Sequence, residues 1–132
     1  MKNISFCFLF MLMLSSCSIS TMTTFYSMSK GKLDVPKKES YNVVYQASFG
    51  DGLTANVAYA NESGKETELK EVSGAWEKSV TLKSGTHVQL TTFATAKHKS
   101  KAEYKILVDG KVVSEYELSG KKLKYTFAFD LP

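Results

Sequence analysis

The 132-residue sequence contains no arginine, so all 17 of its basic side chains are lysine. Arginine supplies the planar two-point contact that grips phosphate and guanine edges, and its absence argues against sequence-specific recognition of nucleic acid. The 13 acidic residues leave a formal charge of only +4. A positive field of this size suits an anionic lipid, a glycan or an acidic protein face. Scattered lysines also keep β-proteins soluble and protect their sheet edges.

Cysteine and histidine are equally scarce. Cys7 and Cys17 both precede the part of the chain expected to fold, which excludes a disulfide scaffold and a cysteine-based metal site there. His87 and His98 have no cysteine, histidine or acidic partner at metal-ligand spacing. The sequence also lacks a Gly-x-Ser-x-Gly nucleophile elbow and a glycine-rich phosphate loop. We therefore expect no metal, no cofactor and no enzymatic activity.

Residues 1–16 have the composition of a signal peptide that is removed. Lys2 precedes an apolar run over residues 4–14, which is too short to cross a bilayer. The run ends at Leu14-Ser15-Ser16-Cys17, which resembles the bacterial lipobox. The resemblance implies diacylglyceryl transfer to the Cys17 thiol, cleavage before Cys17 and acylation of the new amino end, and several acyl chains together anchor a protein stably. The alternative is an ordinary secretory leader followed by a chance cysteine.

The residues after Cys17 bear on location. Aspartate at this position retains lipoproteins resembling those of enteric bacteria in the inner membrane, so Ser18 favours the outer membrane. No acidic cluster follows, which favours the periplasmic face over the cell surface. Residues 17–40 are rich in serine, threonine and lysine without a sustained period, and this predicts a flexible tether. Phe25 and Tyr26 would be disordered with it, lie at the lipid headgroups or dock on the domain.

From Tyr41 the sequence alternates between apolar and polar residues, which predicts a single β-domain over 41–132. Seven or eight short strands at roughly 8–12-residue spacing are typical of an antiparallel β-sandwich of immunoglobulin-like type. We expect a charged edge strand over 66–72 and Trp76 at the centre of the core. Asp109-Gly110 predicts a two-residue type I′ turn. Residues 96–101 read as a basic loop, and Ser119-Gly120 as a further turn.

The order and spacing of five segments resemble the soluble domain of the MmpS transport-accessory family: 41–45, 55–61, 74–76, 88–90 and 104–113. Members of that family carry a similar opening strand, a tryptophan before the fourth strand and a Val-Asp-Gly hairpin. This chain departs in having Ala75 where the family has proline, no cysteine near the last strands, and a lipidated Cys17 in place of an uncleaved transmembrane helix. The resemblance implies an accessory role for a membrane exporter of the resistance-nodulation-division type.

Two surface features are candidates for binding. One is the basic segment with Lys97, His98, Lys99 and Lys101, which lysines 121, 122 and 124 extend. The other is an outward aromatic side chain, best represented by Phe93, because its neighbours Val88, Leu90 and Ala94 take the opposite face of the strand. The lysines are equally compatible with plain solvated charge, and Phe93 with packing under the tether or a loop.

The sequence thus predicts a lipid-anchored module of the cell envelope that docks onto another envelope protein and binds no nucleic acid. The first alternative is a binder of a small ligand or glycan, or an inhibitor of an envelope hydrolase. A weaker alternative is a catalytic lipoprotein, which a buried histidine–carboxylate pair would support.

Overall fold

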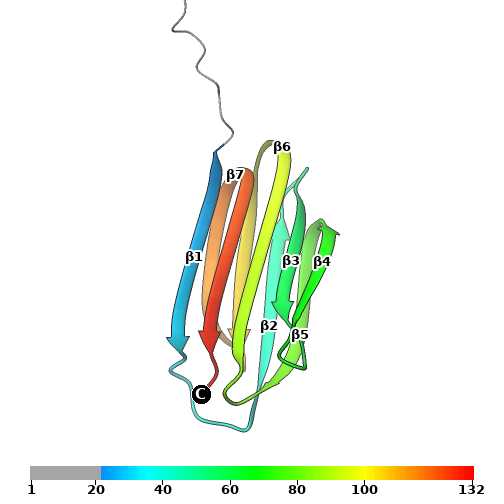
Figure 1. The fold of residues 1–132 in the computed structure, drawn as a ribbon. Helices are drawn as coiled ribbons and strands as arrows, with labels where there is room; N and C mark the ends of the chain where they lie inside the picture. Colours follow the sequence, from blue (N-terminus) through cyan, green and yellow to red (C-terminus); the bar gives the residue numbers. More distant parts are fainter. Residues whose placement is uncertain (1–21) are drawn as a thin grey trace, which may run out of the picture.

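The computed structural model describes residues 22–132, and this part of the chain forms seven β-strands and no helix. The all-β prediction is confirmed. The strands run along the long axis of the molecule (Figure 1). Their bounds are β1 (Thr23–Lys32), β2 (Ser40–Phe49), β3 (Thr54–Ala60), β4 (Glu66–Val72), β5 (Gly74–Lys83), β6 (His87–Val108) and β7 (Lys111–Asp130).

The strands form two layers because β6 and β7 are long enough to belong to both. Residues 87–95 of β6 pair with residues 122–130 of β7, and residues 90–95 also pair with β3. Residues 102–108 pair with β2 and with the first half of β7. The first layer therefore has the order β1-β7-β6-β3-β4 and the second the order β7-β6-β2-β5. The two layers pack face to face, as the sandwich prediction expects (Figure 1).

Part of the range 17–40, which the sequence predicts as a flexible tether, is a strand in the structure. Residues Thr23–Lys32 form strand β1, which pairs in parallel with β7 from Thr23↔Lys122 onward, so the sheet is mixed and not purely antiparallel. Threonine and aromatic residues favour a pleated, half-buried surface. Tyr26 supplies the packing, with its ring centroid 3.8 Å from that of Tyr116. Residues 1–21, which include the predicted signal peptide and Cys17, lie outside the described residues.

Two further predicted breaks lie inside strands. Residues 96–101, read as a basic loop, belong to β6, and Ser119-Gly120, read as a turn, belongs to β7. The register between β6 and β7 shifts between Thr95 and Ser100, where the hairpin passes from one layer to the other. A Cβ atom on Gly120 would lie 3.1 Å from the Thr24 hydroxyl oxygen, so glycine permits the close approach of β1 here. The residues at this crossing are polar, so the sequence alone predicts a loop where the two strands continue.

The predicted turn at the other end of the hairpin is confirmed. Asp109 and Gly110 have φ angles of 47° and 81°, and two positive φ values define the type I′ turn. The Asp109 carboxylate fixes the turn to the adjacent strand, since it accepts the Asn42 backbone N–H at 2.9 Å and pairs with the Lys38 ammonium at 3.0 Å. The predicted edge strand is also confirmed, because β4 pairs only with β3.

The core lies between the layers, and the core cluster is drawn entirely from residues 33–131. Its centre is aromatic, with the rings of Tyr104 and Tyr125 stacked at 4.2 Å. The prediction that Trp76 occupies the centre is wrong. β5 is an edge strand of the second layer, so Trp76 is half-buried at the margin, against Tyr59. The largest fully buried side chains are Tyr41, Tyr45, Tyr104, Tyr125, Phe127 and Phe129.

Candidate functional site

Phe93 lies on the outer face of the first layer and is 39% exposed, as its place on the strand predicts. Its cross-strand neighbours are Asn56 on β3 and Lys124 on β7. Lys124 is in turn paired with Phe25 on β1, whose side chain is 72% exposed. Strands β6, β7 and β1 thus place two exposed phenylalanines on either side of one lysine.

The predicted basic segment is divided by the crossing of β6. Lys97, His98 and Lys99 are exposed within the stretch where the β6–β7 register shifts. Lys101 lies beyond the shift, and its ammonium group is 3.4 Å from the Glu103 carboxylate and 3.7 Å from that of Glu117. Lys97 and Lys99 therefore follow Phe93 on the same stretch of β6 and remain exposed. Lys101 is ion-paired on the second layer.

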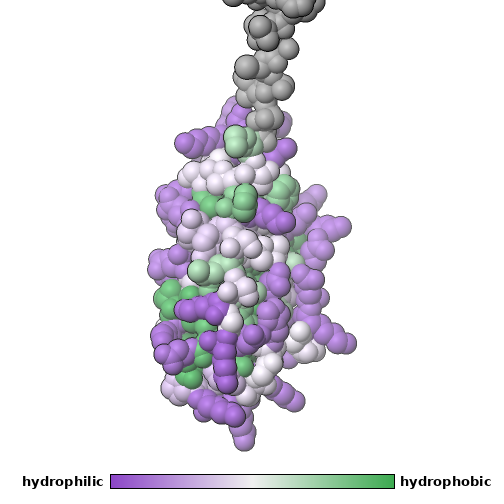
Figure 2. All heavy atoms as spheres, turned by 60° about the vertical axis from the view of Figure 1, so that its left-hand side comes forward, coloured by the Kyte–Doolittle hydropathy of each residue, from purple (hydrophilic) through white to green (hydrophobic). Residues whose placement is uncertain are grey.

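Strand β1 brings further residues to this surface that the sequence alone did not place there. Thr23, the first residue of β1, pairs with Lys122, which also pairs with Thr95. Met22 just before it is 82% exposed. Hydrophilic atoms border apolar ones at the end of the molecule where β1 begins (Figure 2). We call the following set the basic–aromatic surface: Phe25, Phe93, Lys97, Lys99, Lys121, Lys122 and Lys124.

The lysines of the basic–aromatic surface are not neutralised within the described part of the chain. All five are exposed, and none forms an ion pair with another described residue. Two carboxylates lie on neighbouring elements. Asp51 is in the turn after β2, where its backbone carbonyl accepts the Ser100 hydroxyl at 3.1 Å, and Glu71 is near the end of β4. Positive charge therefore exceeds negative charge at this end.

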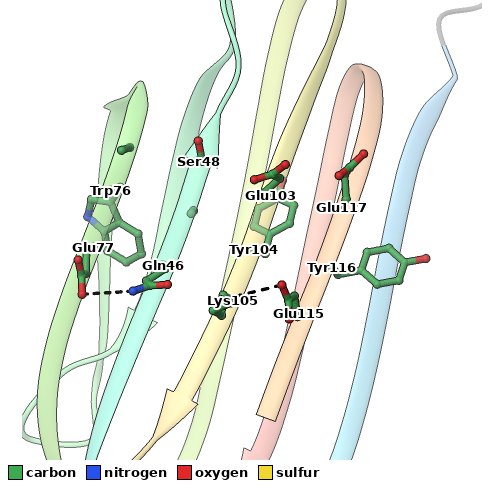
Figure 3. A pocket seen from close by; sticks show the side chains of 12 residues that line it. Gln46, Ser48, Trp76, Glu77, Glu103, Tyr104, Lys105, Glu115, Tyr116 and Glu117 are labelled. Atoms are coloured by element: carbon green, nitrogen blue, oxygen red, sulfur yellow. Dashed lines mark hydrogen bonds and ion pairs between the residues drawn. The ribbon is translucent and has the colours of Figure 1, made fainter. Parts of the chain in front are cut away.

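A second candidate is an open hollow of about 720 Å³ on the outer face of the second layer (Figure 3). All its lining residues come from β2, β5 and the second-layer halves of β6 and β7, so it does not reach the core between the layers. Ala47 and Tyr104 are buried and form its floor, and polar side chains stand around them. The lining residues are Gln46, Ala47, Ser48, Ala75, Trp76, Glu77, Glu103, Tyr104, Lys105, Glu115, Tyr116 and Glu117.

The hollow carries four carboxylates and one lysine. The Gln46 side-chain amide donates to Glu77 at 3.4 Å, and the Lys105 ammonium lies 3.9 Å from the Glu115 carboxylate. These exposed pairs are weak and exchange readily with water or with a partner's side chains. Neither histidine nor cysteine lines the hollow. The arrangement can accept hydrogen bonds and positive charge, whereas the ring of Trp76 lies on the inner face of the layer, against Tyr59.

His87 has an acidic neighbour in the structure that spacing along the sequence does not reveal. Its Nδ1 atom lies 2.6 Å from Asp130 Oδ1, because the β6–β7 register places the two residues opposite each other. Both side chains are half or more exposed to solvent, at 59% and 50%. Among the described residues no hydroxyl group hydrogen-bonds to His87, so the pair lacks a nucleophile to activate.

The groups whose pKa values are shifted lie in the core or at the Asp109 turn, and not in either candidate surface, except for Tyr104 at the floor of the hollow. Burial raises the pKa of Tyr45, Tyr104 and Tyr125. The Tyr45 hydroxyl donates to the Ala60 carbonyl at 2.9 Å, and that of Tyr125 lies 2.7 Å from the Ser114 hydroxyl. The Tyr104 hydroxyl lies beside that of Thr92 but has no partner in hydrogen-bonding geometry. The pKa of Asp109 is lowered by the Asn42 N–H and by Lys38.

Residues 22–132 contain no cluster of three or more acidic, histidine or cysteine side chains able to hold a metal ion. Within the same range no helix is long and apolar enough to span a membrane. Comparison with known proteins finds no matching family model and no match among curated proteins. Residues 22–132 thus present two candidate binding surfaces, one basic and aromatic at the start of β1, the other acidic on the second layer.

Proposed function

We propose that this protein is a lipid-anchored interaction module of the bacterial cell envelope. It is held to the membrane through Cys17 and acts by contact with another envelope protein, without catalysis. The observation that carries the proposal is the sequence Leu14-Ser15-Ser16-Cys17 at the end of an apolar leader, followed directly by a compact domain. Ser18 and the absence of a following acidic cluster favour the outer membrane and its periplasmic face.

The acidic hollow is the surface that we assign to the protein partner. It lies on the face of the second layer, away from the start of β1, and its exposed carboxylates fit a basic surface on the partner. The resemblance to the MmpS family makes a transporter of the resistance-nodulation-division type the specific partner to test.

Membrane anchoring is tested by Cys17→Ala in the full chain. The variant should lose lipid and leave the membrane fraction, because the thiol is the attachment point. Cys7→Ala is the matched control, since it removes the other cysteine within the leader. If Cys17→Ala partitions with membranes to the same extent as the parent, the anchoring proposal is wrong.

Partner binding is tested by cross-linking in intact cells followed by purification of the protein. The charge reversals Glu77→Lys and Glu115→Lys together should abolish recovery of the partner, because they oppose its basic surface. The control pair Glu62→Lys and Glu66→Lys makes the same change of charge away from the hollow. Recovery of no protein with the parent, or equal recovery with both pairs, would remove the support for docking through this surface.

A second candidate function is binding of a small polar ligand or glycan, which the size of the hollow favours. An open hollow of about 720 Å³ with several hydrogen-bonding groups has the dimensions of a small-molecule site. A thermal-shift screen of sugars and envelope metabolites would detect such a ligand. Stabilisation that Gln46→Ala abolishes, without loss of the fold, would favour this function over protein docking.

A further inference from the structure

We infer that the end of the sandwich where β1 begins binds an anionic phospholipid surface directly, through the basic–aromatic surface. The domain then lies against the membrane and does not swing freely above it. This inference rests on the proposed anchoring at Cys17 for its place in the cell, although binding to lipid is a property of the folded domain itself.

The first step is the length of chain between the anchor and the domain. A tether up to residue 40 would allow the domain to move well away from the membrane. Strand β1 begins at Thr23, so only residues 18–22 separate it from Cys17. A chain of that length reaches at most about 18 Å even when fully extended. The start of β1 is therefore held close to the lipid headgroups whenever Cys17 carries lipid.

The second step is the charge that gathers at this end. Lys122 pairs with the first residue of β1, Lys121 adjoins it, and Lys97 and Lys99 lie in the neighbouring crossing of β6. These ammonium groups have no carboxylate partner among the described residues. Each lysine near an anionic membrane strengthens binding by about fivefold, and the effect extends over about one Debye length.

The third step is the apolar component. Phe25 and Phe93 flank Lys124 on the outer face of the first layer, and exposed Met22 precedes β1. Neither phenylalanine is covered, because β1 runs beside the sheet as an added strand and not across its face. Aromatic side chains next to lysines are typical of surfaces that enter the interfacial layer of a bilayer.

The opposite end of the sandwich lacks exposed phenylalanines among the described residues, and it points away from the membrane in this arrangement. Lys38 is paired there with Asp109 and the His87 ring contacts Asp130. Lys32, Lys37 and Lys83 form no ion pair with another described residue, but no exposed aromatic side chain lies beside them. The absence of arginine argues against a nucleic-acid ligand for the lysines. Unpaired cations, exposed aromatics and the chain leading to the anchor coincide only at the start of β1, and this coincidence selects a lipid surface as the occupant.

The experiment uses the chain from residue 17 to 132 with Cys17→Ser, so that no acyl group contributes, and circular dichroism verifies that it is folded. Its cosedimentation is measured with vesicles of phosphatidylglycerol mixed with phosphatidylcholine, and with phosphatidylcholine alone. We expect binding only to the anionic vesicles, and we expect it to weaken as the salt concentration rises.

Two sets of variants locate the surface. Lys97→Gln, Lys99→Gln, Lys121→Gln and Lys122→Gln combined should weaken binding by at least about tenfold. The matched quartet Lys32→Gln, Lys37→Gln, Lys65→Gln and Lys83→Gln removes the same charge elsewhere and should change it by less than about twofold. Phe25→Ser, which alters a side chain that is largely exposed, should weaken binding by about threefold at unchanged thermal stability.

Equal loss of binding in both lysine quartets would overturn the inference, because general charge would then suffice. Equal binding to neutral and anionic vesicles would overturn it as well. Binding to heparin with no measurable binding to anionic vesicles would assign the lysines to an acidic polymer in place of lipid. Because the tested chain carries no acyl group, these outcomes are independent of whether Cys17 is lipidated in the cell.

Discussion

The two ends of the sandwich hold their charged and aromatic side chains in different ways. At the end with the Asp109 turn, Asp109 is bonded to Asn42 and Lys38, and the Tyr41 hydroxyl donates to the Pro36 carbonyl at 3.0 Å. At the end where β1 begins, the lysines of the basic–aromatic surface form no ion pair with another described residue, and its phenylalanines are exposed. Satisfied groups stabilise the fold, whereas groups left exposed and unpaired are available for contact.

The difference also explains why the same residue type has two roles in one molecule. Lys38 belongs to the first kind, because it fixes the segment before β2 onto the Asp109 turn. Lys122 belongs to the second kind, because its neighbours in the sheet are threonines without charge. Position in the sheet, and not composition, decides whether a lysine is structural or available to a ligand.

The largest effect is expected from breaking the core that joins the two ends. Tyr125→Ala removes the stack on Tyr104 and the contact with the Ser114 hydroxyl. We expect a loss of about 3–5 kcal/mol in the free energy of unfolding, measured by urea denaturation. Tyr116→Ala is the comparison, since this ring lies at the margin and is 41% exposed. Equal losses would show that the core is not centred on Tyr125.

Alkaline pH should destabilise the core next most strongly. Burial raises the pKa of Tyr45, Tyr104 and Tyr125 above the ordinary value of 10.0. Their neutral form is favoured in the folded state, so stability is complete below pH 10 and falls as the pH rises beyond it. Urea denaturation across this range measures the fall, and Tyr104→Phe should reduce it. A free energy of unfolding that stays constant above pH 10 would contradict this.

A smaller effect is expected where β1 is attached. Tyr26→Ala removes the ring that stacks on Tyr116 and lies near Tyr125. This should lower the free energy of unfolding by about 1–3 kcal/mol and speed hydrogen exchange of the β1 amides. Tyr26→Phe keeps the ring and should behave like the parent. If β1 exchange is unchanged in Tyr26→Ala, the strand is held by its backbone hydrogen bonds alone, and the short distance to the anchor does not depend on this contact.

The smallest effect is expected at the Asp109 turn. The Asn42 backbone N–H and then Lys38 lower the pKa of the Asp109 carboxyl below 3.8. Its stabilisation is therefore present above that pH and is lost as the pH falls through the lowered pKa. Asp109→Asn retains a residue that tolerates positive φ and should flatten the acid side of the pH–stability profile. A profile identical to that of the parent would show that the carboxylate contributes nothing.

The sequence allowed the local features of this fold to be predicted. Alternation placed Val88, Leu90 and Ala94 inward, and the Asp109-Gly110 dipeptide predicted its turn, because both depend on residues close in the chain. The pairing of β1 with β7 joins residues almost a hundred positions apart. No periodicity within 17–40 reveals such a partner, so the sequence alone predicts a tether there.

The candidate surface could be predicted only in part, because only some of its residues are close to one another in the chain. Phe93, Lys97 and Lys99 were found from their own strand, whereas Phe25 joined them only through β1. Lys101 was misplaced, because the register shift in β6 turns it toward Glu103 and Glu117. The His87–Asp130 contact was missed because its members are 43 residues apart in the chain.

The most direct test of the account is mass spectrometry of the amino-terminal peptide of the protein isolated from the cell envelope. The account predicts a peptide that begins at Cys17 and carries a diacylglyceryl group on its sulfur atom together with an acylated amino terminus. A peptide that begins at another residue, or that contains Cys17 with a free thiol, would contradict it.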